Sequence, residues 1–122
     1  MTASLGRLVL YTKRLPEMVA FYGDHFGYTT RVRDGDRITE LVPPAGGVTL
    51  LLHKAAKGQR EGQAQVKLVF DVKDVPAFID AAREQGLVFG PIHDGIGYSF
   101  ANTKDPSGNS VQISSRSYVN SD

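Results

Sequence analysis

The chain has 122 residues, a formal net charge of +1 from 14 Lys and Arg against 13 Asp and Glu, and no cysteine. This length suits one domain, and the balanced charge predicts no nucleic-acid or membrane partner. The lack of cysteine excludes disulfides, zinc thiolates and thiol nucleophiles. The first residues contain no basic start followed by an apolar stretch, so we expect no signal peptide and no membrane span, and the cytoplasm is the expected compartment.

The first half of the chain predicts a strand, a helix and three further strands. Apolar residues recur at helical spacing from Leu15 to Phe26, and Gly27 stands where that helix should stop. Turn residues at 34–36 and 43–47 separate the strands that follow. The predicted strands are residues 8–11, 28–33, 38–42 and 48–53.

The second half repeats this order. Its helix should begin after Asp74, whose carboxylate can accept hydrogen bonds from the first turn, and should end at Gly86. Asp105-Pro106-Ser107-Gly108 matches a type I turn before the last strand. The predicted strands are residues 66–72, 87–92, 98–102 and 111–114, with a turn at 94–97.

Two sets of residues recur at a fixed offset between the halves. Leu15-Pro16 and Val75-Pro76 lie 60 positions apart, and Arg7 and Lys67 have the same spacing. The repeat predicts an α+β fold in which two βαβββ modules form a curled mixed sheet. Half a chain this short cannot bury a sheet alone, so the modules should pack together or swap between chains, and a homodimer is expected. The expected layout is one domain over residues 1–122, with module one at 5–54, a linker at 55–64 and module two at 65–117.

Short motifs within this pattern resemble those of a known protein family. Phe21-Tyr22 precedes His25-Phe26-Gly27-Tyr28 at the end of the first helix, and Val72-Lys73-Asp74-Val75 leads into the second. Asp105-Pro106-Ser107-Gly108-Asn109 stands before the last strand. In this order and spacing, the chain resembles the vicinal-oxygen-chelate superfamily, which contains glyoxalases, bleomycin-resistance proteins and extradiol dioxygenases.

The resemblance implies a cup in which metal-dependent members place four ligands, usually His, Gln or Glu. Carried onto this chain, the four positions are Arg7, Leu50, Lys67 and Gln112. Arg7 has no lone pair to give, and Leu50 cannot coordinate a metal. Lys67 could do so only after losing its proton, and Gln112 offers a neutral oxygen. We therefore expect no metal site and no cofactor.

Side-chain alternation predicts which residues face the cup. Arg7 and Lys67 would make its centre cationic, and two interpretations stay open. Either they bind a small anionic ligand, since Arg gives a planar fork and Lys a point charge, or they pair with carboxylates such as Glu40 or Asp71 and only fill the cup. The predicted ligand-binding set is Arg7, Tyr11, Leu50, Lys67, Tyr98 and Gln112, with Val9, Leu52, Val69, Ser110 and Ser114 on the same face.

The histidines show no metal-binding spacing. His53 is predicted to point away from the cup, whereas His93 lies at its rim and is, with Lys67, a candidate acid or base. Two functions remain open for a protein with this resemblance. One is metal-free binding of a small molecule, as in antibiotic-resistance proteins. The alternative is a lyase, isomerase or dioxygenase that depends on a divalent metal, and the sequence leaves open whether the chain is an enzyme.

Overall fold

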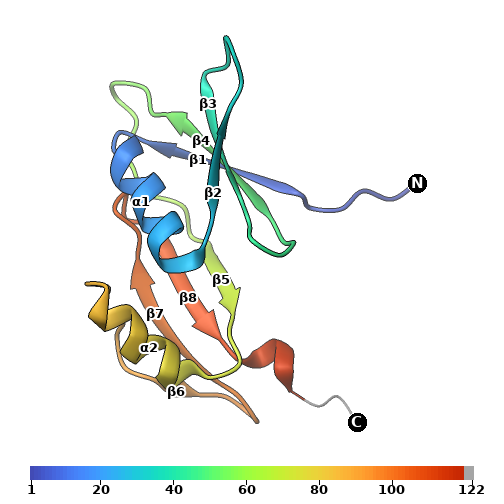
Figure 1. Cartoon of the computed structure of the whole chain (residues 1–122), viewed down its shortest axis with the longest axis vertical. Coiled ribbons are helices and arrows are strands. Elements are labelled where there is room, and N and C mark those ends of the chain that lie inside the picture. The colour runs from blue at the N-terminus through green and yellow to red at the C-terminus, as the bar shows by residue number, and fades with distance from the viewer. Residues whose placement is uncertain (120–122) are drawn as a thin grey trace. The chain divides into compact units, whose positions relative to one another are not determined.

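The computed structural model describes residues 1–119, and the chain divides into two compact units, Met1–Glu61 and Gly62–Asp122. Each unit contains one α-helix and one four-stranded mixed sheet (Figure 1). The predicted α+β class and the two βαβββ modules are therefore confirmed.

The first module forms a sheet in the order β1-β4-β3-β2. β1 and β4 pair in parallel, whereas β3 pairs antiparallel with both β4 and β2. The chain thus returns from the last strand to the side of the first one. The elements are β1 (Arg7–Thr12), α1 (Leu15–Phe26), β2 (Thr29–Val32), β3 (Ile38–Val42) and β4 (Thr49–Lys54).

The second module repeats this topology, with the order β5-β8-β7-β6 and a parallel pair between β5 and β8. Arg7 and Lys67 are the first residues of β1 and β5, so they hold equivalent positions in the two modules. The elements are β5 (Lys67–Asp71), α2 (Val75–Glu84), β6 (His93–Asp94), β7 (Ser99–Lys104) and β8 (Ser110–Ser114), followed by the 3₁₀ helix η1 (Arg116–Tyr118).

Both helices begin and end close to the predicted places. The backbone of Gly27 has a φ of 73°, the left-handed conformation that glycine adopts readily, and its N–H donates to the Gly23 carbonyl at 3.1 Å. The Asp74 carboxylate accepts from the Ala77 N–H at 3.0 Å, as expected of an N-cap, and α2 ends at Glu84, before Gly86. Within residues 1–119, neither helix has the length and apolar character needed to cross a membrane.

One face of each sheet contributes to an apolar core. In the first module, Leu41, Leu50 and Leu52 are buried, as are Met18 and Tyr22 of α1. In the second module, the buried strand residues are Ala101, Val111 and Ile113, and the buried residues of α2 are Val75, Ile79 and Ala82. The opposite face of each sheet carries both polar residues, such as Arg7 and Lys67, and exposed apolar residues, such as Val9 and Val69, and we call it the open face.

The strand predicted over residues 87–92 is wrong. Only His93–Asp94 forms a strand at this edge of the sheet, although Leu87 and Phe89 are buried and Val88 is 67% exposed. The alternation of buried and exposed side chains is therefore that of an extended segment, but the backbone hydrogen bonds that would make it a strand are not formed. Gly90 makes a single backbone bond to the Asn102 carbonyl at 2.8 Å, and Pro91 has no N–H to donate to a neighbouring strand.

Candidate functional site

Strand pairing defines the open face of the second module. In the parallel pair β5–β8, Val69 lies opposite Gln112 and Asp71 lies opposite Ser114. Residues opposite each other in a sheet project to the same side. The open face of this module therefore carries Lys67, Val69, Asp71, Ser110, Gln112 and Ser114, as the alternation predicted.

The predicted orientation of β4 is wrong. Leu50 lies opposite Leu8, so it faces the apolar core, where it is 2% exposed, and does not share the face of Arg7. His53, predicted to point away from the cup, lies opposite Tyr11 on the open face, with their ring centroids 5.2 Å apart. The three leucines of β4 do not mark one face by themselves. Thr49 and His53, which have the parity of Leu51, indicate the open side, and the register against β1 agrees with them.

Asn102 joins two of the predicted site residues. It lies opposite Gln112 in the β7–β8 pair. Its side-chain oxygen accepts hydrogen bonds from Lys67 Nζ at 3.2 Å and from Gln112 Nε2 at 2.8 Å. Asn102 was not among the residues predicted from the sequence. It lies four positions after Tyr98 in the predicted strand over residues 98–102, so alternation places both side chains on the same face. The structure thus brings Lys67 and Gln112 together around a shared amide oxygen.

An open hollow of about 690 Å³ lies on this face of the second module. Its polar lining includes Lys67, Gln112 and Asp71, and Tyr98 and Phe100 form an aromatic side. The Tyr98 hydroxyl accepts from Arg116 Nη1 at 2.8 Å, and the guanidinium carbon lies 5.1 Å from the Tyr98 ring centroid. Arg116 follows the last strand and has no periodic signal in the sequence, so it was missed as well.

The candidate base His93 lies at the edge of the same sheet. It pairs with Phe100 across β6 and β7, and the two ring centroids are 5.2 Å apart. Phe100 in turn lies 6.1 Å from the Tyr98 ring. The imidazole is therefore part of a row of rings next to the hollow, which is consistent with its predicted place at the rim.

In the first module, Arg7 and Tyr11 lie on the open face, and Glu40 is 8% exposed on that face. The interpretation in which Glu40 pairs with Arg7 is corrected, because Glu40 forms a salt bridge with Arg31 across β2 and β3, with 2.6 Å between Oε2 and Nε. The Arg31 hydrogen bond holds the pKa of Glu40 below its ordinary value, and the charges of Arg33 and Arg7 lower this pKa further.

We expect Arg31→Gln to raise the pKa of Glu40. Because the folded-state pKa is lowered, the salt bridge adds stability that is fully present above the unfolded pKa of about 4.3 and is lost as the pH falls through the folded value. A carbon-detected NMR titration of the Glu40 carboxylate would measure the change. Arg83→Gln is the control, because Arg83 pairs with Asp80 at 3.5 Å on the exposed surface, and an unchanged Glu40 pKa in Arg31→Gln would contradict the expectation.

The donor set does not fit a divalent metal ion. Within residues 1–119, no three His, Asp or Glu side chains lie close enough together to hold one. Arg7 and Lys67 are cations at the positions that correspond to ligands, and Gln112 supplies only a neutral amide. On β4, the open face carries Thr49, Leu51 and His53, and within residues 1–119 the imidazole of His53 belongs to no group of three possible ligands.

Two βαβββ modules of identical strand order, each with one polar open face, define a small α+β protein built from a repeated unit. The sequence matches the Glyoxalase/Bleomycin resistance protein/Dioxygenase superfamily over residues 4–113, and the chain belongs to this superfamily. No curated protein matches the chain.

Solved structures share the fold at low sequence identity. UcmS2 has a TM-score of 0.77 and 20% identity, with 94% of this chain and 99% of that chain covered. TnmS3, an antibiotic binding protein from Streptomyces sp. CB03234, has a TM-score of 0.76 and 16% identity, with 92% and 94% covered. A superfamily member from Sphaerobacter thermophilus has a TM-score of 0.73 and 17% identity, with 93% and 97% covered.

Proposed function

We propose that this protein binds a small anionic molecule without a metal ion, on the open face of the second module. The observation that carries the proposal is the position of Lys67, whose ammonium is held by the neutral side chain of Asn102. Within residues 1–119, Lys67 forms no ion pair, so its positive charge is not neutralised. An ammonium has three N–H donors, and Asn102 takes one of them, which leaves donors for a carboxylate or phosphate.

The rest of the hollow indicates how a ligand would be oriented. Lys67 and Asp71 stand at opposite ends of β5, so an anionic group is favoured at the Lys67 end and disfavoured at the Asp71 end. Gln112 lies beside Lys67 and can offer its second N–H to the same group. The rings of Tyr98 and Phe100 offer apolar area for the body of the ligand. We therefore expect an aromatic or otherwise planar molecule with one carboxylate or phosphate.

Binding is favoured over metal-dependent catalysis because the four positions that correspond to ligands do not suit a metal. TnmS3 supports the choice as a neighbour in fold whose description is an antibiotic binding protein. At 16% identity this likeness concerns the fold, so the proposal rests on Lys67, Asn102 and Gln112. A role for Lys67 or His93 as an acid or base stays a prediction.

A thermal-shift screen of aromatic carboxylates and phosphates, followed by calorimetry, tests this proposal. We expect Lys67→Gln to weaken binding of a hit by about tenfold, because it removes a charge-assisted hydrogen bond. Lys73→Gln removes the same charge from an exposed position after β5 and should leave the affinity unchanged. A hit that binds Lys67→Gln and the unmodified protein equally would show that the ligand site lies elsewhere.

A further inference from the structure

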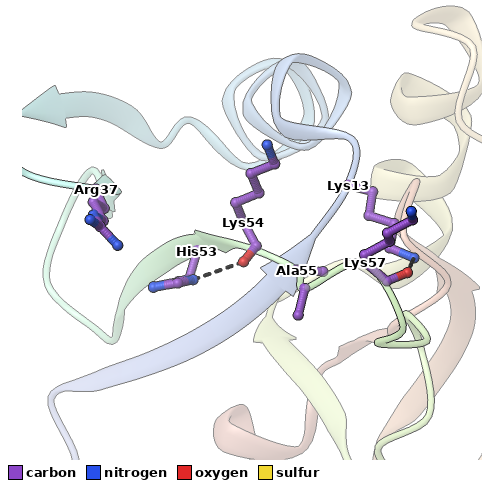
Figure 2. Close-up of a pocket in the computed structure, with 7 residues that line it drawn as sticks. Lys13, Arg37, His53, Lys54, Ala55 and Lys57 are labelled. Atoms are coloured by element: carbon purple, nitrogen blue, oxygen red, sulfur yellow. Dashed lines mark hydrogen bonds between the residues drawn. The ribbon is translucent and has the colours of Figure 1, made fainter.

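A second hollow, of about 780 Å³, lies in the first module at the end of β4 (Figure 2). Four of its seven lining residues are cationic, namely Lys13, Arg37, Lys54 and Lys57, and none is acidic. His53 and the pair Ala55–Ala56 complete the lining. Because the whole chain is nearly balanced in charge, this concentration of positive charge is a local feature.

An adjoining hollow of about 260 Å³ extends the same basic region. It shares Lys13, Arg37 and Lys54 with the first hollow, and it too has no acidic lining residue. Leu15, which is 41% exposed, and Pro16 add apolar surface. We call the two hollows together the basic hollow.

In the part of the chain that the structure describes, the cations of the basic hollow form no ion pair. The ion pairs found within residues 1–119 are Arg31–Glu40 and Arg83–Asp80, and neither includes these cations. Lys13 Nζ donates to the Lys57 carbonyl at 3.3 Å, which is a neutral acceptor. Like charges gathered in this way repel one another, so an anion placed among them would be attracted by all of them.

Two acidic residues stand near the basic hollow, Glu61 through its contacts and Asp36 through its place before Arg37. Their carboxylates accept hydrogen bonds from neutral groups. Glu61 accepts from Thr12 Oγ1 at 3.2 Å and from the Lys13 backbone N–H at 2.7 Å. Asp36 accepts from the Ile38 backbone N–H at 3.1 Å. Neither residue lines the basic hollow. The four cations outnumber these two carboxylates, whose negative charges offset only part of the positive field.

We propose that the basic hollow is a second binding site, specific for small anions that carry two or more phosphate groups. Figure 2 shows Arg37 and His53 on one side of the end of β4, and Lys13 and Lys57 together on the other side. Cations placed on two sides match an extended anion better than a single phosphate. The apolar surface of Leu15 and Pro16 suits an organic group joined to the phosphates. This site is independent of Lys67 in the second module.

Calorimetric titration of the full chain with tripolyphosphate tests the proposal. We expect saturable binding, which the double variant Arg37→Gln/Lys54→Gln weakens by about tenfold or more, because charge-assisted hydrogen bonds to the anion are lost. The matched control is Lys73→Gln/Arg83→Gln, which removes one Lys and one Arg from exposed positions of the second module. The control should bind within about twofold of the unmodified protein, since screened charges at a distance contribute little.

Three results would overturn the proposal. Absence of saturable binding to the unmodified protein would show that the cations form no site. Equal weakening in both double variants would indicate long-range attraction to net charge. Loss of binding in Lys67→Gln with full binding in Arg37→Gln/Lys54→Gln would place the phosphates on the second module. That last result would leave the proposed function standing. If instead Lys67→Gln left the affinity of the aromatic anion unchanged while tripolyphosphate bound as expected, only the basic hollow would remain as a binding site.

Discussion

Asp105→Ala is expected to lower the free energy of unfolding by about 2–3 kcal/mol, because a buried carboxylate with several donors is removed. Asp105 is 5% exposed. Its Oδ1 accepts from the backbone N–H groups of Ser107 at 2.9 Å and Asn109 at 3.0 Å, and its Oδ2 accepts from Asn109 Nδ2 at 2.8 Å. Alanine would leave these donors without their acceptor in a poorly solvated turn. Urea unfolding followed by circular dichroism measures the loss.

The surroundings of the turn leave little room for it to rearrange. Gly62 has a φ of 69°, and a Cβ added there would lie 2.9 Å from the carbonyl oxygens of both Ser107 and Gly108. The control is Asp80→Ala, because Asp80 is exposed and forms only the long surface pair with Arg83. If Asp105→Ala unfolded at the same urea concentration as this control, the carboxylate would have no structural role in the turn.

The features predicted correctly from the sequence are those determined by a few neighbouring residues. Gly27, Asp74 and the Asp105 turn act through local backbone geometry, and all three lie where the pattern placed them. The repeat between the halves extended this local information to the whole topology, because the same order of elements in both halves folds into the same sheet. The strand predicted over residues 87–92 failed because alternation records burial, whereas a strand also needs partners for its backbone.

The candidate site was predicted in part, for a related reason. Lys67, Tyr98 and Gln112 line one hollow, as their shared face implied. Leu50 was placed on the wrong face because its position came from the resemblance, although the shared parity of Thr49 and His53 indicates the opposite orientation of β4. Asn102 was missed because its contacts depend on the register of β7 against β8 and of β8 against β5, which no local pattern determines. Contacts between strands that are distant in sequence are therefore the part of the candidate site that the sequence does not predict.

Asn102→Asp is expected to weaken anion binding more than Lys67→Gln does, by about 10- to 100-fold, since each tenfold corresponds to about 1.4 kcal/mol. The new carboxylate would stand where the amide oxygen now lies, 3.2 Å from Lys67 Nζ, and would neutralise the ammonium as well as repel the ligand. Its oxygen would still accept from Gln112 Nε2, so the sheet should keep its register. Calorimetry with the anion found for the unmodified protein gives the affinity change.

Asn102→Leu separates charge from hydrogen bonding in this prediction. It removes the acceptor that holds Lys67 and Gln112 but adds no charge, so the ammonium stays available to an anion with less fixed geometry. We therefore expect Asn102→Leu to weaken binding less than Asn102→Asp. If both variants weakened binding equally, Asn102 would act by positioning the two donors. If Asn102→Asp bound the anion as tightly as the unmodified protein, Lys67 could not be the charge that attracts it, and the proposed site would have to be abandoned.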